Sequence, residues 1–212
     1  MLRGLIFLFF LFPLLFLNIG CGEKLYSLKI IGSEFLSSDD NFVPNDNYSY
    51  IKLQVNSNPF SYLALGYNDY DVNGNITSVW YSSDKNVLRI KHDRLYSISA
   101  VSTSWYGMSH SSLPNNNFST NTSYKRVRFG HNISENEIIE DVYVSVGNKV
   151  PNSFKKFCNI HDNKYYISEI SVDQYGNKLK SFYGFLQNDK QKQIQCVFQQ
   201  LDQKNIIKWI YL

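Results

Sequence analysis

Short runs in which polar and apolar residues alternate make up most of the chain from Tyr48 onward. A period of two is typical of strands with one buried face, and clusters of turn residues separate the runs. About a dozen strands are predicted, at residues 48–55, 60–67, 76–82, 87–91, 94–101, 124–130, 138–147, 152–160, 164–172, 178–186, 192–200 and 206–212. This spacing favours an all-β fold, built as an antiparallel sandwich or barrel.

Three segments between these runs have distinct patterns. The Asn-Gly pair at 73–74 and the stretch DQYGN at 173–177 predict tight reversals, because glycine accepts a positive φ. Residues 102–123 are rich in Ser, Asn and Thr without periodicity, which predicts a long irregular loop of the kind that often carries function. Ser134 and Glu137 could form a capping box at the start of a helix, while the β-branched continuation is equally compatible with a strand.

The first twenty residues have a pattern of their own. One cation, Arg3, precedes an apolar run from Leu5 to Leu17, and small residues follow before Cys21. This is the layout of a secretory signal peptide. The apolar run of about 13 residues is shorter than the roughly 20 that span a bilayer as a helix, so a permanent transmembrane anchor is the weaker alternative.

Cys21 directly follows Gly20 and is similar to the lipidated cysteine of a bacterial lipobox, although Asn18 replaces the aliphatic residue usual three positions earlier. We expect that Cys21 is acylated, for instance with palmitate, and becomes the mature N-terminus; a plain signal peptide with an incidental cysteine is the alternative. Gly22 is not the Asp that favours inner-membrane retention, which predicts a lipid anchor on the periplasmic face of the outer membrane. The expected organisation is a signal peptide at 1–20, a lipidated N-terminus and tether at 21–47, and a single β domain at 48–212.

Composition agrees with the all-β prediction and argues against one class of partner. The chain has 16 Tyr and 15 Phe, and aromatic residues suit pleated, half-buried strands. A net charge of +3 without a concentrated basic stripe gives no case for nucleic-acid binding. Residues 124–129, YKRVRF, alternate basic with apolar side chains, which predicts a strand with one solvated face.

Two cysteines, Cys158 and Cys196, remain once Cys21 is assigned to the anchor. In an oxidising compartment they form one possible pair, and we predict a disulfide between them. The alternative is two buried free cysteines, since cysteine is often buried without a bridge. No CxxC, HExxH or His/Cys cluster occurs, so we expect no metal site and no cofactor.

Catalytic patterns are weak. The histidines lie in no recognised catalytic spacing: His92, His110, His131 and His161. His92 and Asp93 are neighbours, and neighbours in a strand point to opposite faces. Ser109 and His110 have no G-x-S-x-G elbow around them. Four acids are more simply a solvated face than a pair of glycosidase carboxylates: Glu135, Glu137, Glu140 and Asp141.

Aromatic residues beside polar turns are candidates for glycan binding. Sugar rings have apolar faces that stack on exposed aromatic side chains, and Trp80-Tyr81 and Trp105-Tyr106 offer such rings. Burial in the core is the alternative. Burial is favoured for Trp80, which lies in an alternating strand. For Trp105, which lies in the irregular segment, burial and glycan binding are equally supported.

The first half of the chain resembles the YjbF-like, group 4 capsule polysaccharide lipoprotein family. The resemblance covers about residues 48–101 and lies in an early strand pair, YSYIKLQVNSNPFSYLALGYND, followed by VWYSSDKNVLRIKHDRL. The matching positions are Trp80, Ser82 or Ser83, Asp84, Val87-Leu88 and Arg94-Leu95; Asp93 and Ile98 stand where the family usually has Gly and Thr. We expect Trp80, Asp84 and Arg94 to fix this hairpin.

The resemblance implies an outer-membrane lipoprotein with an antiparallel β domain, associated with machinery that makes or exports extracellular polysaccharide. It implies no catalytic residues, so we expect a non-enzymatic protein that assists capsule or exopolysaccharide assembly or export by binding glycan or an export partner. The alternative is a periplasmic glycan-modifying hydrolase that uses residues 102–134. A structural envelope lipoprotein without a glycan role is a third possibility.

Overall fold

The computed structural model describes residues 42–100, 103–111, 122–130, 137–147, 150–158, 165–188 and 191–212. The expected signal peptide, the acylation site at Cys21 and most of the tether therefore lie outside the described residues. No helix in the described part of the chain is long and apolar enough to cross a membrane.

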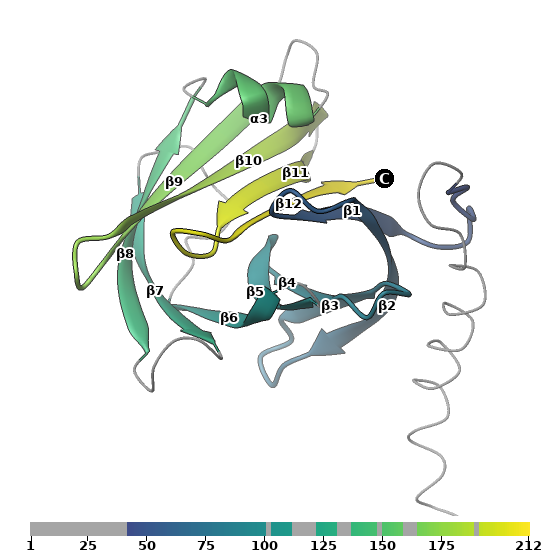
Figure 1. Cartoon of the computed structure of the whole chain (residues 1–212), viewed down its shortest axis with the longest axis horizontal. Coiled ribbons are helices and arrows are strands. Elements are labelled where there is room, and N and C mark those ends of the chain that lie inside the picture. The colour runs from purple at the N-terminus through teal and green to yellow at the C-terminus, as the bar shows by residue number, and fades with distance from the viewer. Residues whose placement is uncertain are drawn as a thin grey trace, which may run out of the picture.

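Twelve antiparallel strands form one closed barrel, as Figure 1 shows. Each strand pairs with its neighbours in sequence, and β12 closes the ring against β1, with Val55 opposite Ile207 and Ile51 opposite Tyr211. The strands are β1 (Tyr50–Val55), β2 (Ser61–Tyr70), β3 (Ile76–Tyr81), β4 (Val87–Lys91), β5 (Arg94–Ala100), β6 (Thr103–Ser111), β7 (Thr122–Gly130), β8 (Ile138–Val146), β9 (Tyr165–Asp173), β10 (Lys178–Asn188), β11 (Gln191–Gln200) and β12 (Ile206–Tyr211). The all-β prediction is confirmed, and of its two architectures the chain adopts the barrel. Closure pairs both edges of the sheet and leaves no open edge strand.

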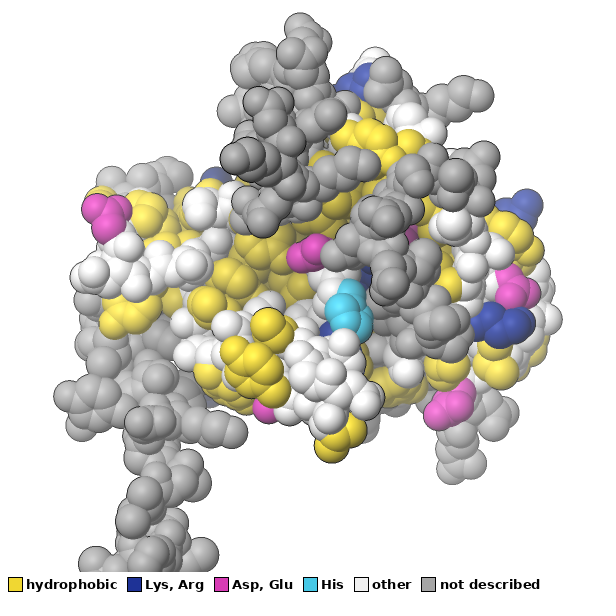
Figure 2. All heavy atoms as spheres, turned by 180° about the vertical axis from the view of Figure 1, so that it is seen from behind, with side chains coloured by type: hydrophobic (Ala, Val, Ile, Leu, Met, Phe, Trp, Pro, Cys, Tyr) yellow, Lys and Arg dark blue, Asp and Glu magenta, His cyan; other side chains and the backbone are white. Residues whose placement is uncertain are grey.

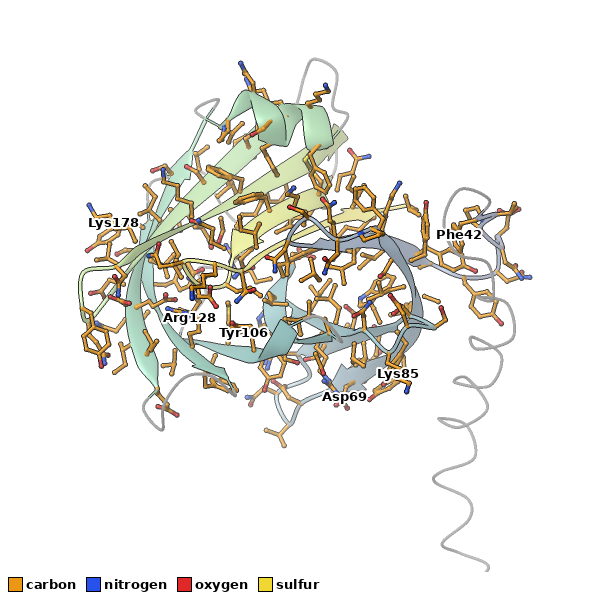
Figure 3. The ribbon with its side chains drawn as sticks, in the orientation of Figure 1. Phe42, Asp69, Lys85, Tyr106, Arg128 and Lys178 are labelled. Atoms are coloured by element: carbon orange, nitrogen blue, oxygen red, sulfur yellow. A yellow bond between two sulfur atoms is a disulfide. The ribbon has the colours of Figure 1, made fainter. Side chains whose placement is uncertain are left out.

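Most of the barrel interior is apolar. Alternate residues of the strands point inward and form one continuous cluster, which includes Ile51, Leu63, Leu88, Ile167 and Trp209, each fully buried. Figure 3 shows Tyr106 and Arg128 inside the ring of strands, whereas Lys178 lies at its outer edge. The described side chains therefore fill most of the barrel interior.

Paired Asp and Asn residues shape two of the hairpin turns. In DVNGN, the Asp71 carboxylate accepts hydrogen bonds from the backbone N–H groups of Asn73 and Asn75 at 2.8 and 2.9 Å, and Asn75 Nδ2 donates to it at 2.8 Å. Asp173 makes the same three contacts in DQYGN. Gly74 and Gly176 have φ of +76° and +82°, as the predicted reversals require.

The turn between β4 and β5 contains only His92 and Asp93, with φ of +50° and +60°. Positive φ at both central residues is the type I′ geometry that matches the twist of a hairpin. Asp tolerates this region better than most residues, which explains how Asp93 occupies the second position of the turn. At the preceding turn, Asp84 accepts hydrogen bonds from Ser61 Oγ at 2.6 Å and Asn86 Nδ2 at 2.9 Å, so it joins β2 to the β3–β4 turn.

A second, smaller apolar cluster lies on the outside of the barrel. The short helix α3 (Asn152–Phe157) packs Phe154 against Tyr166 and Phe182 on the outer faces of β9 and β10. Cys158, directly after the helix, forms a disulfide with Cys196 of β11. The predicted disulfide is therefore present. The strand predicted at 152–160 is wrong, because Pro151 starts a helical turn that covers this outer wall.

Two further segments differ from the sequence pattern. The irregular loop predicted at 102–123 contains β6, which pairs with β7 from Tyr106 opposite Gly130 to Ser111 opposite Lys125. Its Ser-rich composition shows no clear alternation of polar and apolar residues. The strand forms because it is paired on both sides, although its own residues have little preference for strand structure. In the segment with two alternatives, Ser134 lies outside the described residues, and the chain from Ile138 onward is strand β8, paired with β7 and β9.

Candidate functional site

A pocket of about 460 Å³ opens at one end of the barrel. Because antiparallel strands alternate in direction, this end gathers the start of β3, the end of β4, the start of β11 and the end of β12. Figure 2 shows on this side a hollow with hydrophobic surface, beside a histidine and an acidic side chain. The mouth pocket, as we call it, is lined by Gly74, Asn75, Ile76, Ser78, Ile90, His92, Asp93, Ile194 and Tyr211.

Two hairpin tips form one rim of the mouth pocket and are tied to each other. Lys91 Nζ lies 2.8 Å from Asp71 Oδ2, and His92 Nε2 lies 3.1 Å from Asn75 Oδ1. Because an amide oxygen can only accept, His92 Nε2 donates in this contact. Hydrogen bonds from Lys91 first, and then from Asn75, hold the pKa of the Asp71 carboxyl well below its usual range. The rim is therefore held in place by contacts between β2–β3 and β4–β5.

The floor of the mouth pocket is built on Trp80. The indole Nε1 of Trp80 donates to Ser78 Oγ at 2.9 Å, and Ser78 Oγ lies 3.4 Å from the carbonyl oxygen of Ile90. The Trp80 ring also meets the ring of Tyr211 edge-on, with centroids 5.8 Å apart. These contacts fix the positions of Ser78 and Tyr211, so the lining is preorganised in the absence of a ligand.

Asp93 is the acidic residue of the mouth pocket. Its carboxylate has no hydrogen bond or ion pair with any of the residues that the structure describes. Removal from water raises its pKa, although the neighbouring charges of Arg94 and His92 oppose the rise. Burial, followed by the charge of Asp93, likewise raises the pKa of the Tyr211 phenol, so Tyr211 stays neutral and can donate a hydrogen bond.

A buried ionic network lies inside the barrel next to this site. Glu169 accepts hydrogen bonds from Arg94 Nε and Nη2 at 3.0 and 2.9 Å, and from the hydroxyls of Tyr124 and Tyr183, both at 3.0 Å. Both charged side chains are almost fully buried, with exposures of 2% and 1%. Burial would lower the pKa of Arg94, but the charge of Glu169 more than offsets it. The Arg94 guanidinium is thus held mainly by Glu169, and its Nη1 lies 3.5 Å from the carbonyl oxygen of His92.

A second buried ionic group involves β7 and corrects two sequence predictions. Arg126 Nε and Arg128 Nε lie 2.6 and 3.3 Å from the carboxylate of Glu140, whose side chain is 1% exposed. The arginines of YKRVRF therefore face the interior, whereas Lys125 faces solvent beside Asp141. The predicted alternation is confirmed, but the face that carries Arg126 and Arg128 is buried and not solvated. Glu140 is likewise not part of a solvated face, because the two arginines supply its partners inside the barrel.

The predicted glycan-binding aromatics occupy other positions. Trp80 and Tyr106 are 5% and 2% exposed, and the Tyr106 hydroxyl donates to Asp202 in the turn between β11 and β12. Burial removes both ring faces from solvent, so neither can stack on a sugar in this conformation. Tyr81 is half-buried on the outer wall and covers Gly66, while the side chain of Trp105 lies outside the described residues.

Other candidates from the sequence are dispersed. Ser109 is exposed on the outer wall, and Glu137 is exposed before β8. The side chains of His110, His131, His161 and Glu135 lie outside the described residues. In the described ranges, no group of three or more His, Cys, Asp or Glu could hold a metal ion.

The residues that line the mouth were missed because each looks like an ordinary turn or strand-end residue in sequence. Asn75 and Asp93 are typical turn residues, and Tyr211 ends the last strand. His92 and Asp93 were expected to face apart as strand neighbours. They instead occupy a tight turn, where alternation does not apply, and both line the same pocket.

Comparisons with known proteins found no match among family models, curated proteins or solved structures. The resemblance of residues 48–101 to the capsule polysaccharide lipoproteins therefore stays a prediction.

Proposed function

We propose that this protein is a non-enzymatic outer-membrane lipoprotein that assists assembly or export of a surface polysaccharide by binding glycan in the mouth of its barrel. The mouth pocket carries this proposal. It is concave, about 460 Å³ in volume, and combines apolar walls with a few converging polar groups, which is the usual composition of small-ligand sites. Anchorage through Cys21 and the link to polysaccharide come from the sequence.

The lining suits a saccharide in particular. The ring of Tyr211 and the side chains of Ile76 and Ile90 offer apolar surface to the faces of sugar rings. Asn75 and Asp93 supply amide and carboxylate groups that hydrogen-bond sugar hydroxyls. A pocket of this size accommodates one or two sugar residues, so the protein would hold a short part of a longer chain.

A blocking substitution at the rim tests the proposal. Ile76 lies in the pocket lining and is 48% exposed, so Ile76→Trp would fill the opening with little effect on the core. Ile170 on the outer wall of β9 is 40% exposed, and Ile170→Trp is the matched control. Oligosaccharides released from the surface polysaccharide of the producing cells serve as ligands in calorimetric titration.

We expect the wild type and Ile170→Trp to bind these oligosaccharides, and Ile76→Trp to lose binding. Equal binding by Ile76→Trp would place the glycan elsewhere, and no binding by the wild type would remove direct glycan recognition. Incorporation of labelled palmitate into the wild type but not into Cys21→Ala tests the anchor separately. Loss of surface polysaccharide on deletion of the gene, restored by the wild type but not by Ile76→Trp, tests the cellular role.

A further inference from the structure

Among the described residues around the mouth pocket, one carboxylate has no ion-pair partner. Lys91 is paired with Asp71 at 2.8 Å, and Arg94 is paired with Glu169 at 2.9 Å. In each pair the positive charge of the basic side chain is balanced by the negative charge of its carboxylate partner. Asp93 lies between these two cations in sequence, yet neither forms an ion pair with it among the described residues.

The Asp93 side chain is exposed at the rim, and the pocket wall beside it is largely apolar. Ile76, Ile90, Ile194 and Tyr211 line the same pocket and exclude part of the hydration that a free carboxylate would have. Partial desolvation raises the pKa of Asp93, and the nearby charges of Arg94 and His92 oppose the rise without forming an ion pair with it among the described residues. A ligand that brings a positive charge to Asp93 would replace the missing water with a charge-assisted hydrogen bond.

Tyr211 favours the same kind of ligand. Its phenol is neutral, and the negative face of an aromatic ring attracts an ammonium group that lies over it. A carboxylate beside an aromatic ring is therefore a suitable receptor for a cation. An anionic ligand would meet the Asp93 charge without a free cation from Lys91 or Arg94 to offset it.

The rim also determines the kind of cation. Asn75 Oδ1 and the Asp93 carboxylate are oxygen acceptors, and an ammonium group has three N–H donors with which to meet them. The pocket offers three aliphatic side chains for the carbon skeleton next to that group. A primary amine attached to a compact, partly apolar body matches this distribution of groups.

We propose that the mouth pocket binds a protonated primary amine with Asp93 as its counter-ion, and that it selects glycans whose amino sugars are not acetylated. This inference rests on the proposed glycan-binding function and specifies its ligand. Asp93 is the specificity-determining residue, since acetylation of the amine removes the charge that the carboxylate recognises.

Paired ligands that differ only in acetylation provide the test. The disaccharide of β-1,4-linked glucosamine and its N-acetylated form are titrated at neutral pH into the wild type, Asp93→Asn and Asp69→Asn. Asn tolerates the φ of +60° at position 93 as Asp does, so the turn is retained, and thermal melting checks this. Asp69 is an exposed carboxylate of β2 that does not line the pocket, and it is the matched control.

We expect the wild type and Asp69→Asn to bind the free amine at least about tenfold tighter than the acetylated form, which is the range of a hydrogen bond between charged groups. Asp93→Asn should bind both forms equally. Equal affinities in the wild type, or a preference retained by Asp93→Asn, would overturn the inference.

Butylammonium, which carries the amine without a sugar, separates this inference from the proposed function. Binding of both disaccharides without preference, and no binding of butylammonium, would leave glycan binding intact and end the amine inference. Butylammonium binding that depends on Asp93, with no saccharide bound, would retain the amine site and remove the glycan role.

Discussion

Replacing Glu169 with leucine tests whether the buried ionic network stabilises the barrel. Glu169 receives two hydrogen bonds from Arg94 and one each from Tyr124 and Tyr183, all between 2.9 and 3.0 Å. The leucine side chain can accept none of them. Arg94, which is 2% exposed, would keep its charge inside the barrel without a counter-ion.

The size of the effect follows from this arrangement. Breaking a buried pair by removing one partner typically costs about 3–5 kcal/mol, because the other charge stays buried and uncompensated. The Arg94 guanidinium retains weak contacts with the faces of Tyr183 and Tyr124, at 5.5 and 5.7 Å, which supply little compensation. We therefore expect Glu169→Leu to lower the free energy of unfolding by about 3–5 kcal/mol.

The double variant Arg94→Met/Glu169→Leu separates the network from the buried charge. With both charges replaced by apolar side chains, the penalty for an uncompensated arginine disappears, and stability should recover towards the wild type. Urea unfolding followed by tryptophan fluorescence measures all three proteins. Asp141→Asn, which removes one partner of the exposed pair with Lys125, is the control and should change stability by less than about 1 kcal/mol. A double variant less stable than Glu169→Leu alone would refute the reasoning.

Three further predictions concern the wall of the barrel and its rim. Replacing Cys158 and Cys196 with serine should lower the free energy of unfolding by about 3–4 kcal/mol, because the disulfide closes a loop of 38 residues in the unfolded chain; denaturant unfolding with and without reductant checks it. Gly107→Ala should destabilise the barrel by about 1–3 kcal/mol, since a Cβ there would overlap the ring of Phe129 on the paired strand; a thermal melt unchanged from wild type would contradict this. Asp71 has a folded-state pKa below its ordinary value of 3.8, so it stabilises the fold above about pH 4 and this contribution disappears as pH falls further. Asp71→Asn should accordingly flatten the acid limb of stability against pH, measured by thermal melting, and an unaltered limb would show that the carboxylate plays no part.

Local features of the fold could be predicted from the sequence with success. The β3–β4 and β4–β5 hairpins follow from alternation and from turn residues such as Asp84 and Asp93, because both depend on interactions between residues near in sequence. The helix at Asn152–Phe157 could not be predicted in this way. It is stabilised by packing of Phe154 on the outer faces of β9 and β10, which its own six residues do not specify.

The candidate site was the least predictable part. Tyr211 is far along the chain from Asn75 and His92, and it meets them only because the strands of a closed barrel end together. The aromatic residues that seemed most suitable for glycan, Trp80 and Tyr106, are large enough to be needed in the interior, and the barrel buries them. Their burial is what moves the candidate site from the wall to the mouth.

Alternation and turn residues in the sequence are sufficient to predict short antiparallel strands joined by tight turns, and Cys158 and Cys196 are sufficient to predict one possible disulfide. Alternation reveals which residues share a face of a strand, because their side chains are two positions apart. It does not reveal which face is inside. The inward direction of Arg126 and Arg128 becomes evident in the folded barrel, where the buried Glu140 carboxylate pairs with both. Closure of β12 on β1 was decided in the same way, by pairing between strands about 150 residues apart, and that closure creates the mouth in which Asp93 and Tyr211 meet.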